Sequence, residues 1–127
     1  MDQVLLVDDD VLLLIALEAG LDDDGYAVTR AINGNQAVQL LEADHHRIRA
    51  IVTDIRMPGP LDGWDVARRA RELVPDIPVI YITGDSGHDF EHNGVPESRL
   101  LEKPFSIAEL TGTVTHMIGG SPRHMLQ

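Results

Sequence analysis

Short apolar runs of this chain end at or next to residues whose side chains could do chemistry. The carboxylates are those of Asp8, Asp9 and Asp54, the hydroxyl is that of Thr83, and the ammonium is that of Lys103. An all-oxygen set without histidine or cysteine suits Mg²⁺, which often binds a phosphate oxygen as well. The set therefore predicts a site for a divalent cation and a phosphoryl group.

The runs that precede these residues are predicted strands, because they are short, rich in β-branched residues and bounded by polar residues. Amphipathic segments between the strands predict helices, with Asp10 as an N-cap and Gly25 as a stop signal. The predicted strands are Gln3–Val7, Tyr26–Ala31, Ala50–Thr53, Pro78–Ile82 and Arg99–Glu102. The predicted helices are Val11–Asp24, Asn35–Ala43, Trp64–Val74 and Ser106–Met117, with a short or irregular helix between Gly84 and Ser98.

Strictly alternating strands and helices predict an α/β fold, a doubly wound parallel sheet with right-handed crossovers. The commonest five-stranded arrangement of this kind is the flavodoxin-like (βα)5 fold with strand order 2-1-3-4-5. In that order the first and third strands are neighbours, so Asp8, Asp9 and Asp54 would converge at their carboxyl ends. Ligands bind at this edge of open α/β sheets.

Clustered carboxylates repel one another unless a cation neutralises them. If Asp54 attacks a phosphorus atom, the product is an aspartyl phosphate. Lys103 would neutralise one phosphoryl oxygen and Thr83 could donate a hydrogen bond to another, because phosphoryl transfer depends on positioning and charge stabilisation.

Size and composition limit the other possibilities. The chain has 127 residues, a net charge of -11 and no cysteine. These values predict one domain, over residues 1–120 with a short tail over 121–127, and exclude disulfides and thiolate metal sites. The acidic surface argues against nucleic acid as a direct partner, and no apolar stretch is long enough to span a membrane. We expect a cytoplasmic protein without a signal peptide.

Four parts of the chain carry specific motifs: Leu5–Asp10 (LLVDDD), Thr53–Pro58 (TDIRMP) followed by Leu61–Gly63 (LDG), Ile82–Gly84 (ITG) and Lys103–Phe105 (KPF). With these motifs the sequence resembles a receiver domain of a two-component response regulator, of the stand-alone type. The resemblance covers essentially the whole chain.

The resemblance implies a role for each site residue. It makes Asp54 the phosphoacceptor, Thr83 the switch hydroxyl, and Lys103 the phosphate-pairing lysine, with a cis peptide bond before Pro104. It also implies that Mg²⁺ is held by Asp8, Asp9, Asp54 and the backbone carbonyl of Arg56.

The resemblance also implies partners. A histidine kinase or a histidine phosphotransfer protein would donate the phosphoryl group, and the domain would signal to a downstream protein through protein–protein contacts. The chain would be a monomer or weak homodimer and not an enzyme in the usual sense, since it catalyses only its own phosphorylation and dephosphorylation. One departure matters: residue 100 is Leu, where the family usually has the Tyr or Phe whose ring position reports phosphorylation.

Two alternatives stay open. The first is a Mg²⁺-dependent phosphohydrolase with an aspartate nucleophile, of the haloacid-dehalogenase-like type, which Asp8–Asp10 weakly resembles. The second is a receiver-like protein that works only through interactions.

Two other features have competing interpretations. The apolar start of the first helix, Val11–Leu17, predicts either a well-buried helix, which we favour, or exposed leucines that dock a partner. His88, Glu91 and His92 have the H-x-x-E-H spacing of some zinc peptidases, but we interpret them as a solvated polar segment because no third ligand is evident.

Overall fold

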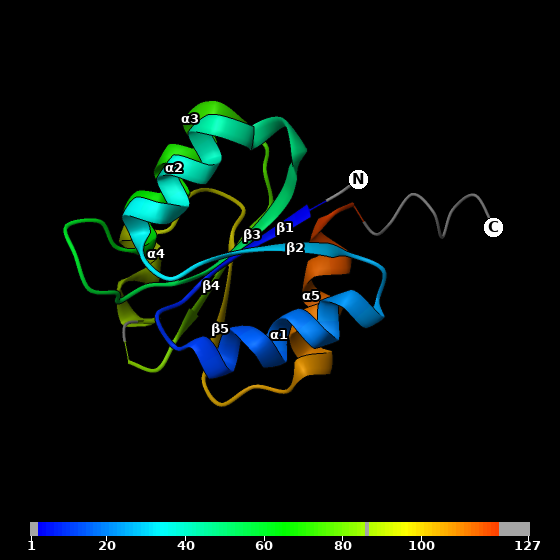
Figure 1. Ribbon diagram of the computed structural model, residues 1–127. Coiled ribbons are helices and arrows are strands. Elements are labelled where there is room, and N and C mark those ends of the chain that lie inside the picture. Colours follow the sequence, from blue (N-terminus) through cyan, green and yellow to red (C-terminus); the bar gives the residue numbers. More distant parts are fainter. Residues whose placement is uncertain (1–2, 86, 120–127) are drawn as a thin grey trace.

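The computed structural model describes residues 3–85 and 87–119, which form a five-stranded sheet between two layers of helices (Figure 1). Every strand pair is parallel and the order is β2-β1-β3-β4-β5. This confirms the predicted doubly wound fold and its strand order. The strands are β1 (Gln3–Val7), β2 (Ala27–Ala31), β3 (Ile48–Asp54), β4 (Val79–Thr83) and β5 (Arg99–Glu102).

The helices cover both faces of the sheet. In Figure 1, α2 and α3 lie on one side of the strands and α1 and α5 on the other. Their bounds are α1 (Val11–Asp23), α2 (Gly34–Asp44), α3 (Gly63–Leu73), α4 (Phe90–Asn93) and α5 (Ile107–Met117), with single 3-10 turns at His45–Arg47 and Gly87–Asp89. The short α4 agrees with the prediction of a short or irregular helix there.

Two apolar cores fill the space between the layers. Alternate residues of the central strands face opposite sides, so Leu5 and Val7 pack under α2 and α3, whereas Val4 and Leu6 pack under α1 and α5. All four are almost completely buried. Burial on both faces explains why these strands are continuous apolar runs in the sequence.

The helices begin where side chains can satisfy their first backbone amides. The carboxylate of Asp10 accepts a hydrogen bond from the amide of Leu13, as predicted for an N-cap. Gly25 follows α1 with a φ of 92°, a left-handed conformation that glycine adopts at low cost. Ser106 caps α5 in a reciprocal capping box with Glu109.

Most predicted boundaries agree with the structure or differ from it by one residue. The largest difference is two residues at β3, which begins at Ile48 rather than Ala50, because the exposed Arg49 interrupts the apolar run without interrupting the strand. The predicted tail, residues 121–127, lies outside the described residues. None of the described helices is long and apolar enough to cross a membrane.

The H-x-x-E-H segment does not form one helix. His88 lies in a 3-10 turn, whereas Glu91 and His92 lie in α4. Within residues 3–85 and 87–119, the only group of three potential metal-ligating side chains is the one formed by Asp8, Asp9 and Asp54. The interpretation as a polar segment is therefore consistent with the structure.

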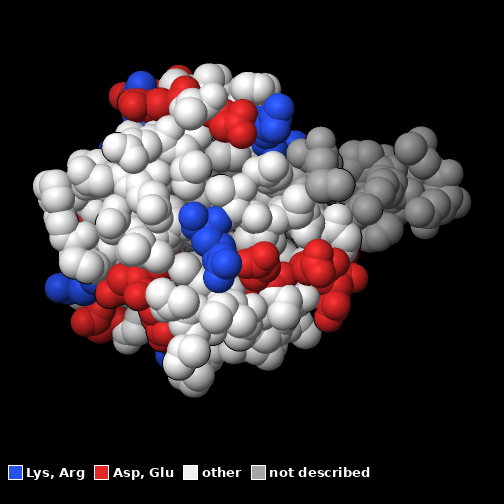
Figure 2. All heavy atoms as spheres, viewed as in Figure 1, with Lys and Arg blue, Asp and Glu red and all other residues white. Residues whose placement is uncertain are grey.

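Helix α1 is less buried than the favoured interpretation predicted. Leu14, Leu17 and Leu21 face the core, but Leu12 is 79% exposed and Ile15 is 51% exposed. Figure 2 shows uncharged surface over α1 between two groups of acidic side chains. The cause is that Val11–Leu17 is apolar on more than one helical face, and the sheet covers only one of them.

Candidate functional site

The acidic residues meet because β1 and β3 are neighbours. Val7 pairs with Thr53, so the next residues, Asp8 and Asp54, leave the sheet side by side. One carboxylate oxygen from each of Asp8, Asp9 and Asp54 lies within 4.8 Å of the others. The structure thus brings together the three carboxylates that the sequence predicted.

Asp54 is held in one orientation at the end of β3. Its Oδ1 accepts a hydrogen bond from the amide of Ile55 at 2.8 Å, and the residue is only 8% exposed. Asp8 is held in a similar way, because its Oδ1 accepts from the amide of Asp10 at 2.9 Å. The sequence reasoning missed both backbone donors, since every residue but proline has an amide and residue type gives no signal for them.

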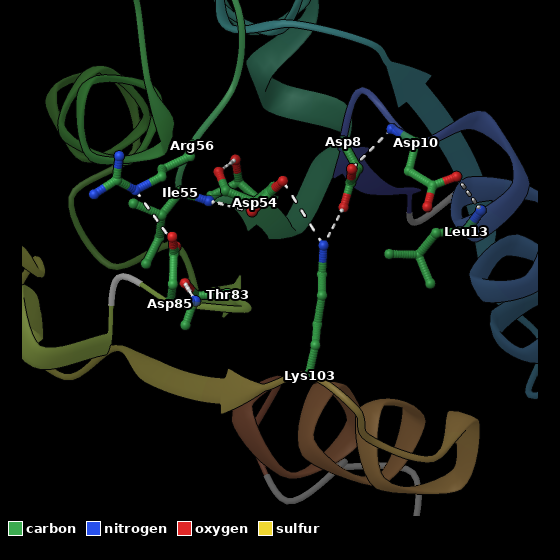
Figure 3. A network of polar contacts seen from close by, with 10 residues as sticks. Asp8, Asp10, Leu13, Asp54, Ile55, Arg56, Thr83, Asp85 and Lys103 are labelled. Atoms are coloured by element: carbon green, nitrogen blue, oxygen red, sulfur yellow. Dashed lines mark hydrogen bonds and ion pairs between the residues drawn. The ribbon is translucent and has the colours of Figure 1, made fainter.

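Lys103 is the only lysine in the chain and reaches over both carboxylates. Its Nζ lies 3.4 Å from Oδ2 of Asp8 and 3.8 Å from Oδ2 of Asp54. In Figure 3 the lysine side chain extends from the end of β5 to a point between the two aspartates. The peptide bond between Lys103 and Pro104 is cis, as the resemblance implied.

Thr83 ends β4 at the same edge of the sheet. Asp54 pairs with Ile82 across the strands, so Thr83 lies one step beyond it (Figure 3). The threonine is 1% exposed, and its Oγ accepts a hydrogen bond from the amide of Asp85 at 3.1 Å. Its carbonyl accepts from the amide of Lys103 at 2.7 Å, which ties the two predicted site residues together.

The environment of the acidic pair disfavours negative charge. Burial and the nearby Asp8 carboxylate raise the pKa of Asp54 from 3.8 to about 6, although Lys103 and the Ile55 amide oppose the shift. Burial also raises the pKa of Asp8. A cation bound here would remove the repulsion that burial strengthens.

The donor set fits a hard divalent cation. The three carboxylates offer oxygen ligands at short mutual distance, two of the acids are buried, and one lysine does not neutralise three negative charges. Mg²⁺ and similar ions are bound by such carboxylates, and they keep free positions for water or phosphate. The cluster therefore could hold a metal ion, and the residues present fit one.

An ion pair between Arg56 and Asp85 lies beside Thr83, where it joins the chain after β3 to the chain after β4. The guanidinium Nε of Arg56 lies 3.4 Å from Oδ1 of Asp85, and both side chains are 70% exposed (Figure 3). The sequence reasoning assigned only the backbone carbonyl of Arg56 and did not assign Asp85. The acid two residues after Thr83 was the one signal that could have indicated this pair.

Comparisons with known proteins agree with this geometry. A model of the response regulator receiver domain family matches residues 4–115. The chain is 32% identical over 120 residues to the response regulator receiver protein CpdR of Brucella abortus, and the match covers 93% of this chain and 98% of that protein. The chain spans about half the length of the transcriptional regulatory proteins that it also matches.

Solved structures give the same result. A response regulator receiver protein from Sinorhizobium medicae shares 42% identity with a TM-score of 0.89, over 92% of this chain and 94% of that one. The receiver domain of a sensor histidine kinase from Pseudomonas aeruginosa, solved with a magnesium ion in its active site cleft, shares 33% identity with a TM-score of 0.77, over 93% of this chain and 98% of that one. None of these matches supports the phosphohydrolase alternative.

The residues matched by the family model include Asp8, Asp9 and Asp54. They also include Thr83, at the end of β4, and Lys103, directly after β5. The chain therefore belongs to the response regulator receiver domain family and is a phosphorylatable receiver of two-component signalling.

Proposed function

We propose that Asp54 accepts a phosphoryl group from the phosphohistidine of a histidine kinase or a histidine phosphotransfer protein. The observation that carries this proposal is the position of Asp54, which is buried, oriented by the Ile55 amide and 3.8 Å from the ammonium of Lys103. The same residues would catalyse both the phosphorylation and the dephosphorylation of Asp54. The proposal requires no substrate other than the phosphodonor.

In the proposed transfer, a carboxylate oxygen of Asp54 forms a bond to phosphorus as the bond from phosphorus to the donor imidazole nitrogen breaks. The electron pair of the broken bond stays on that nitrogen. Lys103 binds a phosphoryl oxygen, and the Thr83 hydroxyl donates to another. Such positioned charges and donors are the main source of catalysis in phosphoryl transfer.

Mg²⁺ is the proposed metal, with Asp8, Asp9, Asp54 and the backbone carbonyl of Arg56 as its ligands. When bound, it would neutralise the carboxylates and the charge on the phosphoryl oxygens. The all-oxygen set supports this choice. The magnesium ion in the cleft of the related Pseudomonas receiver domain supports it as well.

The proposed receiver is residues 1–120, a monomer or weak homodimer that acts in the cytoplasm, where ATP supplies histidine kinases. It would pass the signal on through contact with a downstream protein. A net charge of -11 supports protein rather than nucleic acid as the direct target.

The test is intact mass after incubation with Mg²⁺ and acetyl phosphate. We expect one added phosphoryl group on the wild-type protein and none on Asp54→Asn. Hydroxylamine should remove the group, because it cleaves acyl phosphates but not phosphate esters.

Asp85→Asn is the matched control, since it removes a carboxylate from the same edge of the sheet without a proposed phosphoryl role. It should still be phosphorylated. A phosphoryl group on folded Asp54→Asn, or no added group on folded wild-type protein that binds Mg²⁺, would contradict the proposal.

A further inference from the structure

The loop that follows Asp54 rests on the beginning of α2. This loop, residues 55–62, joins β3 to α3 and contains the carbonyl of Arg56 that we propose as a metal ligand. In Figure 1 it runs past the beginning of α2, and its residue Leu61 lies directly against Gly34, the first residue of that helix. The loop is therefore supported by a third element besides the two that it joins.

The contact leaves no room for a side chain at position 34. Gly34 is buried, and a methyl group there would overlap the carbonyl oxygen of Leu61. The methyl group would also lie 2.9 Å from the carbonyl carbon and 2.8 Å from Cβ of Leu61. Carbon atoms that are not bonded to each other pack at about 3.5 to 4.0 Å. Because the overlapped carbonyl belongs to the backbone, a change of the leucine rotamer would not relieve the clash, and either α2 or the loop would have to move.

Helix α2 is the less movable of the two. Ala37 and Leu41 on its inner face are completely buried in the core. Oδ1 of Asn33 accepts a hydrogen bond from the amide of Gln36 at 2.8 Å, and Oε1 of Gln36 accepts one from the amide of Ile32 at 2.8 Å. Cores are close-packed, so a shift of the helix would disturb many contacts at once. A side chain at position 34 would therefore displace the loop.

The end of the loop at α3 is fixed as well. The amide of Gly63, the first residue of α3, donates a hydrogen bond to the carbonyl of Ile55 at 2.8 Å. A methyl group at Gly63 would overlap the carbonyl oxygen of Asp54 and lie 2.8 Å from Cα of Ile55. Helix α3 thus begins against the backbone that carries the phosphoacceptor, and the loop cannot make room at Gly34 by shifting this end.

The middle of the loop is exposed and stiff. Pro58, Gly59 and Pro60 are all exposed, and the proline rings fix φ at about −65° at two of these positions. A displacement at Leu61 therefore meets few free torsions before it reaches Arg56. Mg²⁺ demands nearly ideal octahedral geometry with oxygen ligands at about 2.0 to 2.1 Å, so a small shift of a carbonyl ligand weakens its binding.

We propose that Gly34 is a positioning residue for the metal site. The space beside its Cα seats the Leu61 carbonyl, and the seated loop holds the Arg56 carbonyl where it can bind Mg²⁺. The inference rests on the proposed function, in which that carbonyl is a metal ligand. Gly34 supplies no ligand and no catalytic group, so its replacement should lower the affinity for Mg²⁺ without changing the chemistry of Asp54 once the metal is bound.

The test is the Kd for Mg²⁺, measured by isothermal titration calorimetry on the wild-type protein and on Gly34→Ala, with urea unfolding of both proteins as a check of folding. The Kd should rise at least about tenfold in Gly34→Ala, the size of effect that is typical when a group that orients a metal ligand is changed.

The rate of phosphorylation by acetyl phosphate separates positioning from chemistry. In Gly34→Ala the Mg²⁺ concentration that gives the half-maximal rate should rise by the same factor as the Kd. The rate at saturating Mg²⁺ should stay within about twofold of the wild-type rate, because the change acts on binding of the metal and not on the transfer step.

Gly20→Ala is the matched control, since it makes the same substitution inside a helix and at a close contact. A methyl group at Gly20 in α1 would overlap Cγ2 of Ile107 in α5, on the opposite face of the sheet from α2. Whatever its effect on the free energy of unfolding, Gly20→Ala should leave the Kd for Mg²⁺ unchanged.

Pro60→Gly tests the same path at an exposed position, where a substitution does not endanger folding. It frees the φ angle that proline fixes, so the Kd for Mg²⁺ should rise about two- to fivefold, because the freed backbone must be ordered again when the metal binds. Pro75→Gly is its control, an exposed proline between α3 and β4 that lies outside the loop, and it should bind Mg²⁺ as the wild type does.

The outcomes separate this role from the function on which it rests. A wild-type Kd in folded Gly34→Ala would overturn the positioning role, as would an equal rise of the Kd in Gly20→Ala. If Gly34→Ala does not fold, a wild-type Kd in Pro60→Gly would overturn it. Each of these results leaves the proposed function intact. Failure of folded wild-type protein to bind Mg²⁺ would instead contradict the proposed metal site, and the positioning role with it.

Discussion

Asp54 and Asp8 carry negative charge where the folded chain disfavours it. Burial raises the pKa of both carboxyl groups, and for Asp54 the value is about 6. A charge that the fold disfavours lowers stability in the absence of a cation and favours the binding of one. The residues that make phosphorylation possible therefore reduce the stability of the metal-free protein.

This gives a prediction for stability against pH without metal. The folded pKa of Asp54 lies above its ordinary value of 3.8, so its favourable contribution is present below about pH 4 and is lost as the pH rises through about 6. In EDTA at pH 7.5, Asp54→Asn should raise the free energy of unfolding by roughly 2 to 3 kcal/mol, from a shift of about two pKa units. Urea unfolding of both proteins at pH 7.5 and pH 5.5 measures this difference in the free energy of unfolding.

The gain from Asp54→Asn should shrink at pH 5.5, because the wild-type carboxyl group is then largely protonated. Asp22→Asn, at an exposed position of α1, is the control and should change little at either pH. A loss of stability in Asp54→Asn at pH 7.5 would show that the charge of Asp54 is favourable in the folded state.

Among the elements, α1 presents large exposed apolar side chains next to the site. It begins directly after Asp8–Asp10, and its residues Val11, Leu12 and Ile15 are exposed to solvent, as is Ile32 after β2. Exposed apolar patches often mark interaction sites, and a protein donor must approach the site closely to deliver its phosphoryl group.

Leu12→Glu should therefore slow phosphorylation by a protein phosphodonor at least about tenfold, the effect of losing one well-buried apolar contact. Its rate with acetyl phosphate should stay as in the wild type, because that donor needs no docking surface. Ala43→Glu, at an exposed position of α2, is the matched control. Equal slowing with both donors would contradict a docking role, and quantitative intact mass against time measures both rates.

The molecule as a whole is one sheet with two cores, and its described secondary structure ends with α5 at Met117. No described residue of the phosphorylation site lies beyond Lys103. The proposed domain of residues 1–120 therefore contains every residue to which we give a role.

A chain shortened to residues 1–120 should fold and be phosphorylated as the full chain is. Its free energy of unfolding should agree within about 0.5 kcal/mol, because both described cores and all described elements lie within residues 1–120. Thermal or urea unfolding, together with intact mass after acetyl phosphate, measures both properties. A larger loss would mean that residues 121–127 belong to the domain.

The fold class, the strand order and the residues that make up the site could be predicted from local sequence patterns. These could be predicted because residues that end neighbouring parallel strands must meet at one edge of the sheet, so local patterns implied that Asp8, Asp54, Thr83 and Lys103 converge. Family resemblance then gave their expected roles. Exact boundaries could not be predicted, as at Arg49, where an exposed charge lies inside a strand.

Other features depend on how the elements pack against one another, and local patterns do not contain them. The sheet covers one face of α1 and leaves Leu12 exposed. Burial together with the separation of Asp8, Asp54 and Lys103 sets the pKa of the acceptor, and no local pattern contains those distances. The contact of Tyr81 with both Phe90 and Val95 likewise arises from packing between elements, because the tyrosine side chain meets these residues only where α4 lies against β4.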